Sequence, residues 1–507
     1  MIVGAGAAGL TLAIELARRR VSFRLIEKLD EPFRGARGKG LQPRSLEVFE
    51  DLEILDRIAA RGGMYPPQRL YRDDGSYADV PLGPASPPTA AEPYRQPLMV
   101  PQFATEAVMR ERLAEWGGSP EFGHELRAFQ QDTEGVNAVV AHAGKEETIR
   151  CRYLVGADGG RSFVRHALGV EFPGKTLGVR ALVADVHVEG LDRDVWHRFN
   201  DARLDTQIAA CPLAGTDMFQ LQAPVALEGD VDLSAEGLTA IFLARTGRQD
   251  VVIRSVSWAS VFTMNARLAD RYQDGRVLLV GDAAHVHPPT GGQGLNTSVQ
   301  DAYNLGWKLA AVVDGAPTTL LATYEEERRP IAAQVLGLSS ALLEAAKRGS
   351  MHRGREVQQL DLGYPESSLA LRTDEPHEAI RPGARAPDAP IRSAAGASRR
   401  LFDLFRGPHW TLLTYGNERE SWIPPRPGLR VHTIAPRGTS AEFVDEGEHV
   451  RAAYGLAPGY GVLVRPDGYV GAVLHRRSMA TLETYLAQVG CHLPYRPNCV
   501  VRSHNCL

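Results

Sequence analysis

Residues 1–10 read MIVGAGAAGL, which places the pattern GxGxxG on Gly4, Gly6 and Gly9. An apolar start precedes this turn, and apolar residues at helical spacing follow it. A second apolar run then ends at Glu27. The signature of a dinucleotide-binding βαβ unit is a strand, a glycine-rich turn, a helix and a second strand, followed by an acidic residue about 20 residues after the turn. This order of elements predicts a Rossmann-type α/β domain.

The three glycines have different physical tasks in such a unit. Gly4 permits the tight turn, Gly6 lets the backbone approach a pyrophosphate, and Gly9 lets helix and strand pack closely. The helix N-terminus attracts the phosphates, and Glu27 would accept hydrogen bonds from the adenosine ribose. Because the turn starts at residue 4, we expect no signal peptide. Three residues are few for a central strand, so a short strand and a longer natural start both remain open.

The composition excludes several classes of protein. The 507 residues suggest about three domain-sized units. The 57 Lys+Arg against 61 Asp+Glu leave a net charge of −4, which does not indicate a nucleic-acid-binding surface. A hydrophobic fraction of 44% excludes a disordered chain, and no apolar run is long enough to span a membrane. Five cysteines over this length are not a disulfide framework. We expect a cytoplasmic, multi-domain protein without a nucleic-acid or membrane partner.

Hydrophobic periodicity gives a coarse map of the remaining elements. Residues 175–265 alternate apolar and polar side chains and are predicted to be mostly β and to form one antiparallel sheet. Residues 350–385 are polar and interrupted by Pro and Gly, which indicates a linker. Helices are predicted over 45–60 with Ser45 as N-cap, over 105–116, as two segments over 297–348, and near 478–488.

Two later motifs carry further chemistry. Residues 154–165 read LVGADGGRSFVR, and residues 275–296 read GRVLLVGDAAHVHPPTGGQGLN. Asp282 at the end of a predicted strand suits a ribityl hydroxyl. The turn from Gly291 to Asn296 would present backbone N–H groups at a helix start to a polar ring edge or a phosphate.

GxGxxG, the DG motif and the GD motif, in this order, resemble the class A FAD-dependent aromatic monooxygenases, the para-hydroxybenzoate hydroxylase superfamily. The closer resemblance is to the aromatic polyketide and phenol hydroxylase branch, which has a C-terminal thioredoxin-like domain. Residues 382–387 (PGARAP) and 464–470 (VRPDGYV) are similar to the linker and the late hairpin of that branch. The resemblance implies a GR2-like FAD-binding domain, an inserted mostly-β substrate domain and a C-terminal thioredoxin-like domain.

The resemblance also implies the domain boundaries. Residues 1–174 and 266–349 would be the two parts of the FAD-binding domain, residues 175–265 the substrate domain, residues 350–385 the linker, and residues 386–507 a thioredoxin-like domain lacking CxxC.

The family positions can be assigned residue by residue. Pro289 and Gly292 would position the flavin ring through their backbone, and no acid or base is assigned. The cofactor-binding residues would be Gly4, Gly6, Ala7, Ala8 and Gly9 at the pyrophosphate, Glu27 at the ribose, Lys28 and Leu126 at the adenine, Arg37 and Gln102 at the phosphate and ribityl region, Asp158 near the pyrophosphate and the NAD(P)H path, Asp282 at the ribityl chain, and Pro289, Gly292, Gly294, Leu295 and Asn296 at the isoalloxazine ring.

The implied reaction uses FAD, NADPH or NADH, and O₂. The flavin C4a-hydroperoxide would deliver one oxygen atom to a phenolic or polycyclic polyketide-like substrate, as in antibiotic biosynthesis. Baeyer–Villiger insertion on the same scaffold and a flavin-binding subunit without turnover remain alternatives. The sequence leaves open whether the chain forms a homo-oligomer.

The substrate would lie between the flavin and the β sheet. Alternation places Met218, Gln220 and Gln222 on one sheet face, and Phe219 and Leu221 on the other. We assign Gln220 and Gln222 to the substrate, while a partly solvated sheet face remains the alternative.

Other conspicuous residues have simpler interpretations. His285 and His287 lie inside the GD motif without a completing ligand set, so no metal site is predicted. Cys491, Cys499 and Cys506 lack CxxC spacing, so the C-terminal domain is interpreted as structural. Two further clusters are the Arg18–Arg20 run, interpreted as a solvated helix end, and the Trp422–Pro424 segment, interpreted as packing.

Overall fold

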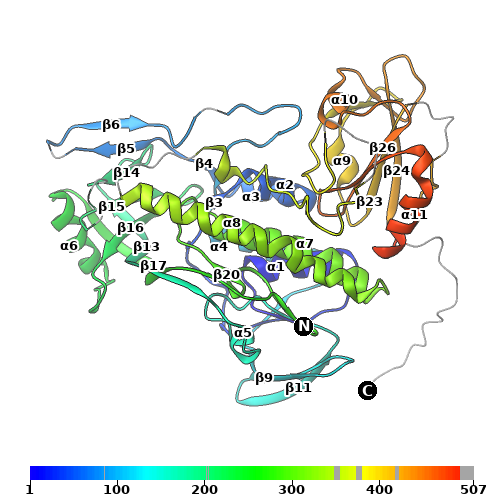
Figure 1. The fold of residues 1–507 in the computed structure, drawn as a ribbon. Coiled ribbons are helices and arrows are strands. Elements are labelled where there is room, and N and C mark those ends of the chain that lie inside the picture. Colours follow the sequence, from blue (N-terminus) through cyan, green and yellow to red (C-terminus); the bar gives the residue numbers. More distant parts are fainter. Residues whose placement is uncertain are drawn as a thin grey trace. The chain divides into compact units, whose positions relative to one another are not determined.

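The computed structural model describes residues 1–72, 74–84, 86–200, 203, 205–347, 354–372, 380–416 and 422–491. The chain forms two compact units. The first comprises residues 1–310 and 321–367, and the second comprises residues 311–320 and 368–507. Figure 1 shows the helices and strands of both units.

A six-stranded sheet organises the dinucleotide-binding part of the first unit. Its central strand β1 (Ile2–Val3) pairs in parallel with β2 (Leu25–Glu27) and with β12 (Leu154–Gly156). Helix α1 (Ala7–Arg18) joins β1 to β2. The predicted βαβ unit is confirmed, and its two-residue first strand is held by a neighbour on each side. The sheet order is β18-β19-β12-β1-β2-β8, with β8 (Pro120–Phe122), β18 (Gln273–Asp274) and β19 (Val277–Leu279).

A second, eight-stranded sheet contains the predicted β region. The long strands β13 (Gly174–Glu189) and β17 (Val252–Leu268) pair antiparallel, and β16 (Phe219–Val225) pairs with the other edge of β13. The order is β20-β17-β13-β16-β15-β14-β5-β6, with β5 (Gln68–Tyr71), β6 (Tyr77–Val80), β14 (Trp196–Phe199), β15 (Ile208–Pro212) and β20 (His285–Val286).

This sheet differs from the sequence prediction in two respects. Helix α6 (Ala235–Thr246) interrupts the β region and buries Leu238 and Phe242 in the core of one sheet face. Strands β5 and β6 come from the segment 1–174 and extend the sheet, and β5 runs parallel to β14. The sheet is therefore neither confined to residues 175–265 nor wholly antiparallel.

The helices of the first unit confirm most of the predicted segments. The predicted helix 45–60 is wrong as a single helix: α2 (Pro43–Asp51) ends before Glu53, which has a φ of 60°, and α3 (Leu55–Ala59) follows. Ser45 lies inside α2, whose N-cap is Gln42. Figure 1 shows the two long helices α7 and α8 side by side. The others are α4 (Gln102–Glu115), α5 (Phe163–Ala167), α7 (Gly294–Val313), and α8 (Ala322–Lys347), which contains Pro330.

Two three-stranded sheets complete the first unit. They are β11-β10-β9, with β9 (Glu125–Gln131), β10 (Val136–His142) and β11 (Lys145–Cys151), and β3-β7-β4, with β3 (Gly40–Leu41), β4 (Gly63–Met64) and β7 (Leu98–Met99).

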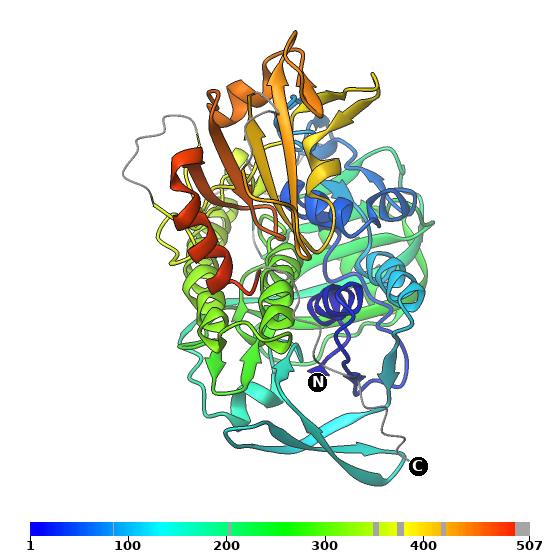
Figure 2. The ribbon, with the colours of Figure 1, turned by 90° about the vertical axis from the view of Figure 1, so that its right-hand side faces the viewer.

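The second unit is built on a seven-stranded mixed sheet (Figure 2). Its central strands β23 (Trp410–Tyr415) and β24 (Leu429–Pro436) are parallel, and β26 (Tyr460–Val464) is antiparallel to β23. The predicted helix near 478–488 is α11 (Met479–Gln488). The thioredoxin-like assignment stays a prediction. The remaining elements are β21 (Pro390–Ser393), β22 (Ser398–Arg400), β25 (Phe443–Asp445), β27 (Val470–His475), α9 (Leu401–Phe405) and α10 (His449–Tyr454).

The arginine run at the end of α1 was predicted to be solvated, and for Arg18 and Arg19 this prediction is wrong. Arg18 pairs with Asp51 at 2.6 Å and with Glu15 at 2.5 Å, and Arg19 pairs with Glu15 at 2.5 Å. The side chains of Arg18 and Arg19 are 6% and 9% exposed, and only Arg20 is exposed. Their charges are therefore neutralised within the fold.

Residues of the second unit support the packing interpretation of Trp422. A Cβ built on Gly461 would lie 3.0 Å from the Trp422 ring, so this ring packs on β26. Cys491 is buried, and burial raises the pKa of its thiol. Cys499 and Cys506 lie outside the described residues.

Candidate functional site

The turn between β1 and α1 is shaped by its glycines. Gly4 has a φ of 104°, and a Cβ built on Gly9 would lie 1.9 Å from the carbonyl oxygen of Gly4. Gly6 is the N-cap of α1, and a Cβ there would meet only Oε1 of Glu106, at 3.8 Å. Gly4 and Gly9 are therefore required for packing, whereas Gly6 keeps the first helical turn accessible. The N–H groups of this turn have no acceptor within the helix.

Glu27, at the end of the neighbouring strand β2, is hydrogen-bonded to this turn. Its Oε2 accepts a hydrogen bond from the Ala5 N–H at 2.9 Å, and its Oε1 accepts one from the Leu29 N–H at 3.0 Å. A carboxylate has about four lone-pair sites, so acceptor capacity remains for a ligand hydroxyl. Next to it Lys28 is exposed, whereas Leu126 is buried in β9.

The start of α4 packs against the same turn. Oε1 of Gln102 accepts a hydrogen bond from the Gly38 N–H at 3.2 Å, and its Nε2 donates to Oε1 of Glu106 at 2.8 Å. Glu106 is buried, and burial raises the pKa of its carboxyl to about 7. Gln102 thus links the loop at Gly38 to a carboxyl group beside Gly6.

The DG and GD motifs are joined by one buried arginine. Arg165 donates from Nη1 to the carbonyl oxygen of Ala283 and from Nη2 to that of Gly160, both at 2.9 Å. Asp158 accepts a hydrogen bond from the Val164 N–H through Oδ2, and its buried Oδ1 has no partner among the described residues. Asp158 therefore keeps one oxygen for a ligand.

Asp282 follows β19 and remains accessible to solvent. Loss of hydration among the surrounding residues raises the pKa of its carboxyl, and the charges of His285 and Arg37 oppose this rise. Arg37 is itself exposed and lies over the rings of Phe33 and Trp258, at 4.9 and 5.8 Å from their centres. Arg37 and Asp282 thus bring opposite charges to the same region.

A buried ionic network holds the GD loop. Oδ2 of Asp301 on α7 lies 2.5 Å from Nε2 of His285, and its Oδ1 accepts a hydrogen bond from Nε of Arg328 at 2.7 Å. His287 is close to this network, and burial together with the charge of His285 lowers the pKa of His287 to about 3. His287 is therefore neutral near neutral pH.

The loop before α7 is tied to residues 40–42. Oδ1 of Asn296 accepts a hydrogen bond from the Gln42 N–H at 2.8 Å, and its Nδ2 donates to the carbonyl oxygens of Gly40 and Gly292 at 2.8 and 2.7 Å. Asn296 thus uses its amide to position backbone. Pro289 is exposed, while Gly292, Gly294 and Leu295 are half-buried.

The predicted glutamines lie on the sheet face opposite the α6 core. Gln220 is 1% exposed, and its Oε1 accepts hydrogen bonds from Nζ of Lys39 and from Nε2 of Gln222, both at 2.8 Å. Its Nε2 donates to the carbonyl oxygen of Ala36. Lys39 also lies over the Trp196 ring, 4.7 Å from its centre. This face therefore meets the loop 36–39 of the dinucleotide-binding part, and Gln220 is internally bonded.

Two models of known protein families match this chain. A family model described as FAD binding domain matches residues 1–339, and one described as aromatic-ring hydroxylase, C-terminal, matches residues 379–490.

The chain belongs to the FAD-dependent aromatic-ring hydroxylases.

Its relatives support this assignment over nearly the whole length. The hydroxylase is 41% identical to a flavin-dependent monooxygenase of Mycobacteroides abscessus, covering 96% of this chain and 99% of the relative. It is 34% identical to a 12-dehydrotetracycline 5-monooxygenase/anhydrotetracycline 6-monooxygenase of Streptomyces rimosus, covering 93% and 94%. A solved structure of aklavinone-11 hydroxylase with FAD and aklavinone matches with a TM-score of 0.80 at 27% identity, covering 96% and 98%.

The residues of the first unit fit FAD. The first turn of α1 contains no acidic side chain, and Gly6 leaves its N–H groups open, which suits a pyrophosphate. Oδ1 of Asp158 has no partner among the described residues, and the Asp282 carboxylate is accessible. These donors and acceptors match the polar parts of a dinucleotide cofactor.

Three residues that shape this site in the hydroxylase were not predicted from the sequence. They are Arg165, which joins the DG and GD motifs, Asp301, which holds His285, and Glu106, which lies beside Gly6. Arg165 and Asp301 lie within or just after quoted motifs, so a search for buried charges there could have found them. Glu106 has no local signal, because the turn at Gly6 that it faces lies far away in the sequence.

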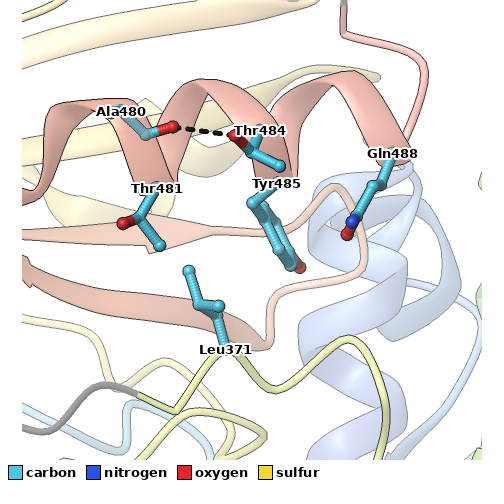
Figure 3. A pocket seen from close by; sticks show the side chains of 6 residues that line it. All are labelled: Leu371, Ala480, Thr481, Thr484, Tyr485 and Gln488. Atoms are coloured by element: carbon cyan, nitrogen blue, oxygen red, sulfur yellow. Dashed lines mark hydrogen bonds between the residues drawn. The ribbon is translucent and has the colours of Figure 1, made fainter.

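Other features carry no comparable chemistry. A hollow of about 370 Å³ lies on α11 in the second unit (Figure 3), but Thr484 donates to the Ala480 carbonyl there and Tyr485 donates to that of Leu369. Among the described residues, no set of three or more His, Cys, Asp or Glu side chains is placed to hold a metal ion. None of the described helices is long and apolar enough to cross a membrane.

Proposed function

We propose that the enzyme uses NAD(P)H and O₂ to insert one oxygen atom into a polycyclic phenolic substrate of the aromatic polyketide type. The observation that carries the proposal is the sheet face opposite α6. Met99, Trp196, Ala209 and Cys211 form a buried cluster there, and Tyr65 packs against it. An apolar, aromatic wall of this kind suits a fused-ring substrate.

The names of the relatives support the same substrate class. Two of them are an anhydrotetracycline 6-monooxygenase and a 6-methylpretetramide 4-monooxygenase, and a third, matched as a solved structure, is aklavinone-11 hydroxylase. All three names refer to compounds of fused rings. We extend this class to the present chain because the rings of Tyr65 and Trp196 lie 6.1 Å apart in this wall and offer aromatic contacts beside the cation of Lys39.

The cofactor would be held as the family resemblance implies. When bound, FAD supplies hydride acceptance from NAD(P)H and the activation of O₂. The first turn of α1 would hold the pyrophosphate, Glu27 the ribose, and Asp282 the ribityl chain. Pro289 and Gly292 would position the ring through their backbone, while Gln222 would orient the substrate and Gln220 would fix the loop 36–39.

The domain roles follow from this arrangement. Residues 1–174 and 266–349 would bind the cofactor, and residues 175–265, together with β5 and β6, would form the substrate wall. Residues 386–507 would be a thioredoxin-like domain with a structural task.

Substrate-stimulated NAD(P)H oxidation tests the proposal. The purified enzyme with FAD is mixed with anhydrotetracycline, aklavinone and simple phenols, each with NADH or NADPH, in air and without oxygen. We expect a fused-ring phenol to stimulate oxidation and to give a product heavier by one oxygen atom. An NMR spectrum with a new ring hydroxyl supports hydroxylation, whereas a ring-expanded lactone contradicts it. No stimulation by any phenol would contradict the proposed substrate class.

A further inference from the structure

A buried carboxyl group stands where α1 begins. Glu106 lies in the second turn of α4 and is 2% exposed. Its Oε1 would be 3.8 Å from a Cβ on Gly6, and the nearby N–H of Ala7 at the start of α1 favours the ionised form of its carboxyl group. The same Oε1 accepts a hydrogen bond from Nε2 of Gln102 at 2.8 Å. Glu106 therefore shares the first turn of α1 with any anion bound there.

Few charges compensate this carboxyl group. Arg110 on α4 favours its ionised form, whereas Glu27 at the end of β2 opposes it. The Gln102 amide and the Ala7 N–H are neutral donors that favour the ionised form. Burial outweighs these contributions and raises the pKa of Glu106 to about 7. The group can thus change its charge near neutral pH.

The ionised form conflicts with the bound cofactor. A pyrophosphate at the first turn of α1 brings two negative charges to the N–H groups that Glu106 faces, and like charges in a buried site repel. A neutral carboxylic acid removes this repulsion. It also gains an O–H donor that can be directed at a phosphate oxygen, a strong charge-assisted hydrogen bond.

We propose that Glu106 binds the FAD pyrophosphate as a neutral carboxylic acid that donates a hydrogen bond, so that cofactor binding takes up one proton from solvent. This inference rests on the placement of FAD proposed above. Glu106 is then a cofactor-binding residue, and the affinity for FAD decreases as the pH rises.

The dissociation constant of FAD at several pH values tests this role. The protein is freed of flavin and titrated with FAD, and the change in flavin fluorescence is measured. Above about pH 7 we expect the Kd of the wild type to rise by up to about tenfold per pH unit, because binding takes up a proton. Glu106→Gln carries a permanent amide donor, so its Kd should be nearly independent of pH. Glu111→Gln, an exposed position on the same helix, is the matched control and should behave as the wild type.

Calorimetry on the wild type gives an answer that does not depend on a variant. Titration with FAD near about pH 8, in two buffers of different ionisation enthalpy, should show an uptake approaching one proton. Glu106→Gln should show none, and its thermal midpoint shows whether it has folded. A wild-type Kd that does not change with pH, or an equal pH dependence in Glu106→Gln, overturns the inference. Absence of FAD binding at every pH would instead contradict the proposed cofactor site.

Discussion

A methyl group added at Gly6 would contact only Oε1 of Glu106, at 3.8 Å, and the backbone of Gly6 is extended. Gly6→Ala should therefore fold normally, while the methyl group keeps a pyrophosphate away from the first turn of α1. Losing one charge-assisted hydrogen bond costs about 1.5–3 kcal/mol, so we expect the Kd of FAD to rise by about tenfold or more. Fluorescence titration measures the Kd, and thermal unfolding checks the fold.

Gly9→Ala is the contrasting control in the same turn. Its Cβ would lie 1.9 Å from the Gly4 carbonyl oxygen, so backbone must move. We expect a lower free energy of unfolding by about 1–3 kcal/mol. Equal stability of the two variants would contradict the division of tasks between Gly6 and Gly9.

The carboxylate of Asp301 neutralises the buried Arg328 and also binds His285. Burial alone would raise the pKa of Asp301, but Arg328 and His285 together lower it. Asp301→Asn leaves Arg328 without this carboxylate, and breaking a buried ion pair costs about 3–5 kcal/mol of unfolding free energy. A carboxyl with a lowered pKa in the folded state stabilises above its unfolded pKa, and this stability is lost as the pH falls.

Urea unfolding at several pH values measures both effects. The stability of Asp301→Asn should fall less steeply with acid than that of the wild type. Glu189→Gln removes an exposed partner of Arg254 and serves as the control, for which we expect an unchanged midpoint. If Asp301→Asn were as stable as this control, the network would not hold the GD loop.

At the level of elements, Arg165 links the loop after β12 to the loop after β19. Arg165→Lys offers one nitrogen to two carbonyl groups, those of Gly160 and Ala283, so one of them loses its donor. An unsatisfied buried acceptor costs about 1–3 kcal/mol, and we expect both a lower thermal midpoint and weaker FAD binding. Arg161→Lys, exposed in the same motif, should change neither property. Thermal unfolding with and without FAD separates the two variants.

Elements with local signals were predicted from the sequence, and elements set by distant contacts were not. GxGxxG and the GD motif place α1 and α7 because the backbone conformation depends on adjacent glycines. Helix α6 was missed because it carries small and apolar side chains around much of its circumference. Glu53, which separates α2 from α3, has a positive φ, and a glutamate in the sequence does not predict this conformation.

The same distinction applies to the side chains of the site. One of the two acidic partners of Arg18, Asp51, lies 33 positions away, so the burial of this arginine could not be predicted from its neighbours in the sequence. The alternation that places Gln220 and Gln222 on one face is local and is confirmed by the strand pairing. The contact of Gln220 with Lys39 spans 181 positions and could not be predicted.

For the whole molecule, the two units differ in their expected effect on the cofactor. The second unit has its own apolar core, in which Leu413 is fully buried. In the first unit, Leu278 is fully buried on β19, directly before the GD loop. Leucine-to-alanine changes at such positions cost about 2–5 kcal/mol. Every residue that we assign to FAD belongs to the first unit. We therefore expect Leu413→Ala to lower the thermal stability without changing the Kd of FAD. Leu278→Ala should lower the thermal stability and also raise the Kd of FAD.

Differential scanning calorimetry and fluorescence titration on the full chain test this expectation. Added FAD should raise the unfolding temperature of the first unit, because a ligand stabilises the state that binds it. Leu413→Ala should retain this increase, whereas Leu278→Ala should reduce it at the same FAD concentration. If Leu413→Ala weakened FAD binding as much as Leu278→Ala, the second unit would contribute to the cofactor site. The structural task proposed for residues 386–507 would then be wrong, because their core would be coupled energetically to the flavin.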